Sequence, residues 1–145
     1  MADIKNLGPL IGRCSQVVDA PRHVAEKVGG AMTLEWLRGE KVILQRSIAE
    51  NPVFPEGVVL IMAAAEDAEG DFTAHYFDSR AVSRVLHMSF QDGIWKWWRR
   101  ATDSDDFDQR FEGTLSEDGK TINSSCYLVE DGEWIHDFDV RYTRA

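Results

Sequence analysis

The chain of 145 residues has only two cysteines and no long apolar run. Cys14 and Cys126 lie far apart and without the spacing of zinc ligands, so neither a disulfide framework nor a zinc site is indicated, and reduced thiols are expected. The longest apolar run, at 58–65, is too short to span a bilayer. The N-terminal segment lacks the layout of a secretion signal, so we expect a cytoplasmic protein.

Basic residues are also scarce, with 16 Lys and Arg against 25 Asp and Glu, which gives a formal charge of -9. Nucleic acids and anionic membranes are both bound through clustered Lys and Arg, so neither is expected as a partner. The segment WKWWRR at 95–100 combines indoles with cations, as single-strand-binding proteins do. Without a wider basic groove, these tryptophans are better explained as part of the wall of a fold.

Several catalytic signatures are missing as well. The sequence contains no nucleophile elbow, no phosphate-binding glycine loop and no HExxH zinc motif. Cys126 could act as a nucleophile beside a histidine, but a buried structural thiol is the commoner situation. Covalent catalysis is therefore not expected, and nothing in the sequence calls for a cofactor.

Turn signals recur at short intervals, and the last three are Asp-Gly pairs at 92–93, 118–119 and 131–132. Asp-Gly accepts the positive φ of tight hairpins, which predicts consecutive antiparallel strands. Ten runs rich in β-branched and aromatic residues lie between these turns: 13–20, 31–37, 41–49, 57–65, 71–78, 82–90, 94–101, 107–115, 120–129 and 133–143. Only the opening segment, with Pro9, predicts a short helix, and 102–108 reads as a solvated acidic loop.

Ten up-and-down strands are expected to close into a barrel, because closure removes exposed strand edges. The size predicts one all-β domain over residues 1–145. Barrels of about eight or more strands can enclose a small molecule, and inward residues alternate with outward ones along each strand. Alternation should therefore identify the residues that line a cavity.

The segments MTLEWLRGE, HYFDSR, DGIWKWWRR, QRFEGTLSEDGKTI and WIHDFDVRYTR make the chain from residue 30 onward similar to a family of uncharacterised bacterial proteins. The resemblance implies a lipocalin-like (calycin) β-barrel, distantly similar to the haem-binding nitrobindins and to fatty-acid-binding proteins. It implies a fold and no defined reaction. The family pattern has Gly-x-Trp segments where this chain has Cys14 and Cys126, so two indoles are replaced by thiols. These losses either reshape the interior near one end or are compensated by other packing.

His136 is the most interesting polar residue of the last strand. If Phe138 and Val140 point inward, strict alternation sends Trp134 and His136 inward as well. A histidine on such a face is commonly a hydrogen-bonded core residue. The functional interpretation is that it transfers protons or ligates a haem iron, as imidazole does near neutral pH.

Two further strands offer polar candidates. In 71–78, either His75 or Tyr76 lines the interior, and alternation alone does not decide which, nor which face of 94–101 points inward. Arg46 is in phase with Val42 and Ile48, so it is expected to need a partner such as a ligand carboxylate or Glu35. Asp78 and Arg80 are better explained as a salt bridge at the rim.

The predicted function is the binding of a small, largely hydrophobic or aromatic molecule inside the barrel, and the oligomeric state, a homodimer included, is left open. An acid-base enzyme (isomerase, cyclase, dehydratase or hydrolase) is the alternative, and whether the chain is an enzyme stays undecided. Its catalytic residues would be His136, Tyr76 and Arg46. A nitrobindin-like haem protein ranks third. The predicted ligand-contacting residues are Trp36, Met62, His75, Met88, Trp97, Phe111, Cys126, Trp134 and Phe138.

Overall fold

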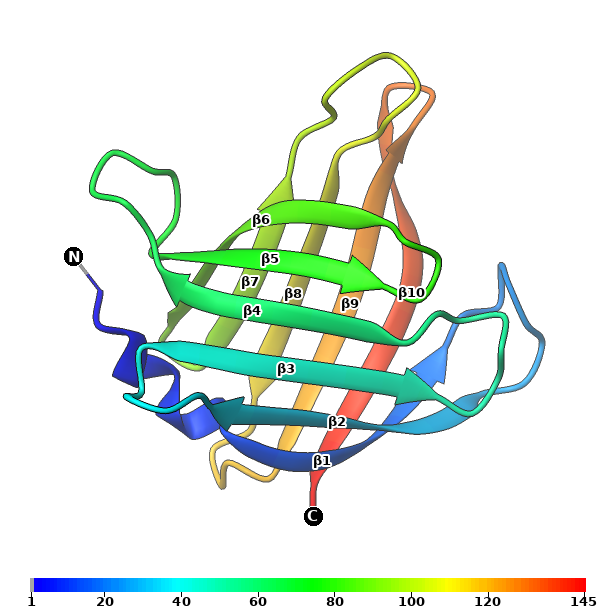
Figure 1. Cartoon of the computed structure of the whole chain (residues 1–145). Coiled ribbons are helices and arrows are strands. Elements are labelled where there is room, and N and C mark those ends of the chain that lie inside the picture. The colour runs from blue at the N-terminus through cyan, green and yellow to red at the C-terminus, as the bar shows by residue number, and fades with distance from the viewer. Residues whose placement is uncertain (1) are drawn as a thin grey trace.

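The computed structural model describes residues 2–145 and consists of ten strands and one short 3-10 helix (Figure 1). In chain order the elements are η1 (Ile4–Leu10), β1 (Gly12–Asp19), β2 (Val28–Trp36), β3 (Val42–Ala49), β4 (Gly57–Ala63), β5 (Phe72–Asp78), β6 (Ser83–Gln91), β7 (Ile94–Arg99), β8 (Gln109–Leu115), β9 (Thr121–Glu130) and β10 (Glu133–Arg144). The predicted all-β class, the ten strands and the short N-terminal helix are confirmed. The largest shift is at β2, which begins at Val28 rather than at 31.

Every strand pairs antiparallel with its neighbour in the chain, and β1 pairs with β10, so the sheet closes on itself. In Figure 1, strands β2 to β6 lie in front, and β7 to β10 cross behind them at a steep angle. The predicted closed, up-and-down antiparallel barrel is therefore what forms, and this architecture is consistent with a calycin-like fold. Closure leaves no sheet edge for pairing with another chain.

Two of the predicted Asp-Gly turns are two-residue hairpins. Asp92 and Gly93 both have positive φ, 55° and 75°, and Asp131 and Gly132 have 52° and 78°. Such a pair of left-handed residues matches the twist of antiparallel strands. The pair at 118–119 differs, because it lies in a longer connection in which the Gly119 amide donates to the Ser116 carbonyl.

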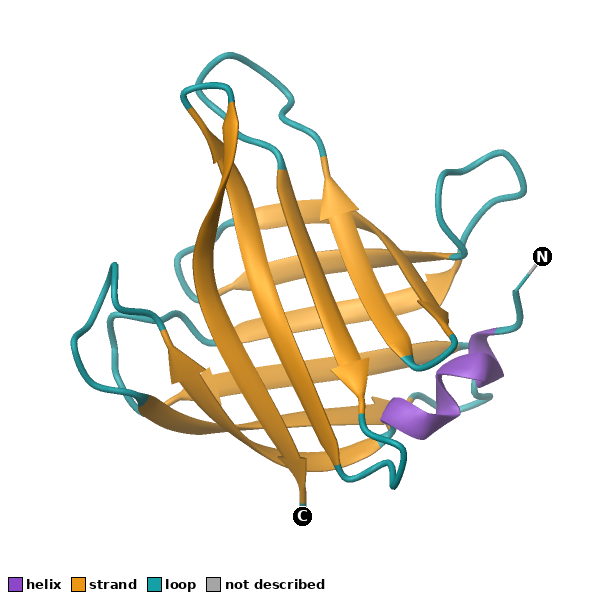
Figure 2. Ribbon diagram, turned by 180° about the vertical axis from the view of Figure 1, so that it is seen from behind, coloured by secondary structure: helices purple, strands orange, loops and turns teal. Residues whose placement is uncertain are grey.

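The 3-10 helix closes one end of the barrel (Figure 2). Leu7 is fully buried and Leu10 nearly so. The guanidinium of Arg144, at the end of β10, donates to the carbonyl oxygens of Ile11 (2.7 Å) and Pro9. The helix is therefore tied both to the apolar interior and to the last strand, and it blocks access from this side.

The interior beside η1 is filled with large apolar side chains. Inward positions alternate with outward ones, as in the buried Cys14 of β1, near η1, whose neighbours Arg13 and Ser15 are exposed. Close packing of this kind leaves little space for a ligand at this end. The most completely buried side chains of the barrel wall are Met32, Leu34, Ile43, Ile61, Phe72, Met88 and Trp95.

Gly30 and Gly29 provide a stability test of the packing inside β2. A Cβ atom added at Gly30 would lie 2.2 Å from the backbone oxygen of Ile48, whereas at Gly29 it would meet only the mobile carboxylate of Glu50 at 3.1 Å. We expect Gly30→Ala to lower the free energy of unfolding by at least about 2 kcal/mol, and Gly29→Ala to change it by less than about 0.5 kcal/mol. Urea unfolding of both variants measures the difference, and equal effects would contradict the packing described.

Candidate functional site: the barrel interior

The end of the interior opposite η1 remains accessible to solvent. Several side chains there are only half-buried, although they share an inward strand face with fully buried residues. Tyr76, for example, shares its face with Phe72 and Ala74, which have no exposed surface. The half-buried inward side chains at this end include Gln45, Ser47, Tyr76, Arg84, Trp97, Gln109 and Phe138.

Aromatic rings form the wall between the filled and the accessible ends. Trp97 stacks on Phe111 with the ring planes 2° apart and the centroids 5.7 Å apart. Trp95 packs edge-on against the same Phe111 ring at 5.1 Å. Trp97 is half-buried while Phe111 is buried, so part of the Trp97 side chain remains exposed. This surface suits a flat or aliphatic ligand.

Three polar side chains at the end of β5 and just after it form a hydrogen-bonded network at the accessible end. The Tyr76 hydroxyl donates to the Asp78 carboxylate at 2.6 Å, and the Arg80 guanidinium donates to the same carboxylate at 2.8 Å. The bonds from Arg80, together with that from Tyr76, hold the pKa of Asp78 well below its usual range. Burial and the neighbouring Asp78 carboxylate raise the pKa of Tyr76, so its hydroxyl is protonated at neutral pH. The Asp78–Arg80 salt bridge agrees with its predicted rim position.

A second charged group, Arg99, faces inward at the end of β7. Its guanidinium donates to Asp106, to the Phe107 carbonyl (2.8 Å) and to the Gln109 side chain (3.2 Å). The predicted solvated loop at 102–108 is mostly exposed, but Asp106 turns back to pair with Arg99. The loop is thereby fastened beside the accessible end.

Seven of the twelve predicted site residues point into the barrel. Tyr76 lines the accessible end, and Trp36 packs against the buried core beside η1. Alternation did not decide which face of 71–78 points inward, and the structure shows that it is the face with Tyr76 and Asp78. On β7 the inward face carries Trp95, Trp97 and Arg99. The inward members are Trp36, Tyr76, Met88, Trp97, Phe111, Cys126 and Phe138.

The predicted inward orientation of His136 is wrong, because β10 contains a β-bulge. The register against β9 shifts between His136 and Phe138, so Asp137 is an extra residue on β10. A bulge of this kind interrupts the alternation of side chains. Phe138 points inward, whereas His136 pairs with the outward Tyr127, and nearly half of its side-chain surface is exposed. Trp134, two residues earlier, lies outside for the same reason.

The orientation predicted for Arg46 is also wrong. Arg46 and Ile48 are exposed on the outer wall, while Ile43, with no exposed surface, faces inward on β3. Met62 and His75 likewise face outward, because their neighbours Ile61 and Ala74 occupy the interior. Alternation separates the two faces of a strand, but the outer face of this barrel is apolar in places, so composition pointed to the wrong face.

A serine, a histidine and a carboxylate meet on the outer wall of β9 and β10. The His136 imidazole and the Ser125 hydroxyl each lie 2.6 Å from the same oxygen of Asp139. Burial opposes ionisation of Asp139, but the two hydrogen bonds prevail and lower its pKa. In a nucleophilic triad the histidine must bond to the serine. Here the carboxylate stands between them, so the arrangement does not activate Ser125.

Histidines do not line the interior in the part of the chain that the structure describes. His75, His87 and His136 are on outward strand positions, and His23 lies in the loop after β1, bonded to Asp137 at 2.9 Å. Within residues 2–145, no group of three or more His, Cys, Asp or Glu side chains could hold a metal ion. An interior haem would therefore find no imidazole ligand, and the residues do not fit the nitrobindin alternative.

The two thiols are free and buried on inward faces. Cys14 is opposite Arg144 on β10 and Cys126 is opposite Phe138, six residues away, which corresponds to about 20 Å along the strand. The two positions at which an indole is replaced by a thiol thus lie at different heights in the barrel. They do not lie together near one end, as the sequence analysis had considered. Burial raises the pKa of Cys126, so the thiol is protonated and unreactive at neutral pH.

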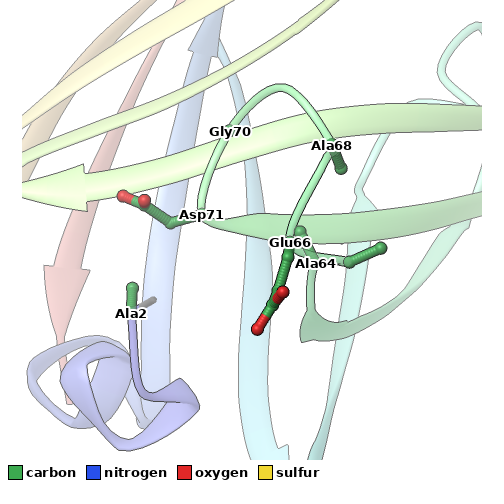
Figure 3. Close-up of a pocket in the computed structure, with 7 residues that line it drawn as sticks. Ala2, Ala64, Glu66, Ala68, Gly70 and Asp71 are labelled. Carbon is green, nitrogen blue, oxygen red and sulfur yellow. The ribbon is translucent and has the colours of Figure 1, made fainter.

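Two pockets lie outside the barrel wall. One, of about 440 Å³, is between Ala2 and the loop after β4, where Glu66 and Asp71 are its acidic residues (Figure 3). The other, of about 230 Å³, lies on the outer wall beside Ser125 and Asp139. Neither is lined by an aromatic side chain, so neither matches the surface found inside.

Comparison with known proteins adds no family assignment. No protein-family model matches the chain, and no curated protein matches it. Among residues 2–145 no helix has both the length and the apolar character needed to cross a membrane.

Sequence reasoning missed several polar residues that face the interior, among them Gln16, Gln45 and Arg99. Gln16 alternates with Cys14 and Val18, and this period was the signal that could have located it. Gln45 shares its face with Ile43, and its amide donates to the sulfur of Met32 at 3.5 Å. Only the observed orientation of β3 shows that this face is the inner one.

The Tyr76–Asp78 pair should make stability depend on acid. The pKa of Asp78 is lower in the folded than in the unfolded chain, so the ionised carboxylate contributes fully above about pH 5, and this contribution is lost as the pH falls below about 4. We expect Asp78→Asn to lower the free energy of unfolding by about 1–2 kcal/mol at neutral pH, and the difference from the natural chain to shrink at about pH 3.

Urea unfolding at both pH values measures this change. The control is Asp67→Asn, because Asp67 is exposed in a loop and should make no difference at either pH. A difference for Asp78→Asn that stays constant with pH would show that its carboxylate does not titrate as inferred.

Proposed function

We propose that the protein binds a small, largely hydrophobic organic molecule in the barrel interior, and that the molecule enters at the end opposite η1. The observation that carries this proposal is the group of half-buried, inward-facing side chains at that end, among them Trp97 and Phe138. Solvent reaches these rings although they face inward. A ligand in contact with them would remove apolar surface from water, which is the main source of affinity in such sites.

The shape of the ligand follows from the aromatic wall. The stacked pair of Trp97 and Phe111 offers a flat surface, and Phe138 reaches the same interior from β10. A planar or aliphatic molecule of modest size fits a barrel of this kind. The sequence resemblance to calycins, whose barrels enclose small molecules, supports the same function, and we propose that the chain is related to them.

An acid-base enzyme finds less support in the same interior. Its proton-transferring residue was predicted to be His136, which lies outside with Asp139. Tyr76 does face inward, but its hydroxyl already donates to Asp78. A ligand-binding function therefore requires fewer assumptions than an acid-base enzyme.

Blocking the accessible end tests the binding function. Ser47 faces inward near Tyr76, since a Cβ at Gly57 would contact both side chains, whereas the next residue, Ile48, is half-exposed on the outer wall. We expect Ser47→Trp to weaken binding of the neutral fluorescent probe N-phenyl-1-naphthylamine at least about tenfold, because the indole fills the entrance. Ile48→Trp is the matched control and should bind the probe as the natural chain does.

Fluorescence titration of the probe measures both affinities, and native mass spectrometry of the purified protein identifies any retained molecule. His136→Ala should leave the probe's dissociation constant unchanged, since the imidazole is outside. If Ser47→Trp and Ile48→Trp reduce binding equally, or if the natural chain binds no probe, the interior is not the binding site.

A further inference from the structure

Three mostly buried polar side chains that face the barrel interior have no hydrogen-bond partner in the described residues 2–145. The indole nitrogen of Trp95 is completely buried and makes no hydrogen bond. Within the described residues 2–145, no hydrogen bond joins the side-chain amide of Gln16 or the hydroxyl of Tyr142 to another protein group, although these residues are only 6% and 8% exposed. Buried polar groups are nearly always bonded, so the amide of Gln16 and the hydroxyl of Tyr142 are available to a partner that is not part of the chain.

Two of the three are direct neighbours. Gln16 on β1 and Tyr142 on β10 are register partners in the ladder that closes the barrel, and both face inward. Gly30 lies on the other side of Gln16, and a Cβ there would approach the Gln16 amide nitrogen to 3.0 Å. Because Gly30 has no side chain, the Gln16 amide can occupy the space beside it. An amide and a hydroxyl side by side offer both donors and acceptors to one polar group.

The charged side chains that face the interior already have partners within the protein. Burial raises the pKa of Tyr142, so its hydroxyl stays protonated at neutral pH. Asp78 pairs with Arg80 and Arg99 with Asp106, whereas the inward Arg84 of β6 donates to the Ser83 carbonyl at 2.9 Å. Arg144, beyond Tyr142, donates to backbone carbonyls of the helix and of the turn before β9. A charged ligand group bound by Gln16 and Tyr142 would therefore lose its hydration beside an arginine, Arg144, that already donates to other oxygen atoms.

We infer that the ligand is a neutral, oxygen-bearing hydrophobic molecule whose hydroxyl or carbonyl group is bound by Gln16 and Tyr142. This inference rests on the proposed binding function and adds the chemical class of the ligand. The apolar body lies against the aromatic wall, and the oxygen reaches the β1–β10 pair. Alcohols, ketones and amides fit this arrangement, whereas hydrocarbons and carboxylates do not.

Four compounds that share one ring system test the inference by displacement of N-phenyl-1-naphthylamine: naphthalene, 2-naphthol, 2-acetonaphthone and 2-naphthoate. We expect 2-naphthol and 2-acetonaphthone to bind at least about tenfold more tightly than naphthalene, since two neutral hydrogen bonds each contribute about three- to tenfold. The anion 2-naphthoate should bind more weakly than the neutral oxygen compounds.

The variants Tyr142→Phe and Gln16→Leu remove the polar atoms and nearly preserve the side-chain volumes. Each should reduce the advantage of 2-naphthol over naphthalene about three- to tenfold and leave the affinity for naphthalene itself unchanged. Tyr127→Phe removes a hydroxyl from the outer wall and is the matched control, with no expected change. Each variant is judged by the ratio of its affinities for 2-naphthol and naphthalene. A general loss of stability would lower both affinities and leave this ratio unchanged.

The outcomes separate the two proposals. If the probe binds but the oxygen compounds gain no advantage, or if the variants leave the ratio unchanged, then Gln16 and Tyr142 hold only water, and the inference is overturned while the binding function stands. If neither the probe nor any of the four compounds binds to the natural chain, both proposals are overturned.

Discussion

The ladder between β1 and β10 is the interaction on which the rest of the structure depends. Without it, the ten strands would form an open sheet with two unpaired edges and no interior. Closure gives every strand an inner and an outer face, and it brings Gln16 beside Tyr142, more than a hundred residues later in the chain. The ladder that closes the barrel therefore also places Gln16 and Tyr142 side by side on its inner face.

The two ends of the barrel differ in what covers them. At one end, η1 inserts Leu7 and is held by Arg144, so large side chains fill the interior. At the other end no helix intervenes, and Tyr76 and Trp97 are only half-buried. This asymmetry resembles that of a binding protein with one entrance. At that end Asp78 pairs with Arg80 and Arg99 with Asp106, while Arg84 donates to a backbone carbonyl.

A single extra residue decides what the last strand offers to the interior. Asp137 shifts the alternation of β10, so Phe138 points inward and His136 points outward. On the outer wall His136 and Ser125 bond to Asp139, which stabilises the ladder there and performs no recognisable chemistry. Beside the charged side chains at its accessible end, the interior holds amide, hydroxyl and indole groups, which bind neutral polar atoms and do not transfer protons readily near neutral pH.

Local patterns in the sequence determined the class of fold, the ten strands and the Asp-Gly hairpins at 92–93 and 131–132, because alternation and turn chemistry depend only on near neighbours. They also indicated Trp97, Phe111 and Tyr76 as residues of the wall. Only the tertiary structure decided which face of β3 is the inner one, where the bulge interrupts β10, and that Gln16 meets Tyr142. Each of these depends on the pairing of strands distant in sequence, so no local pattern encodes it.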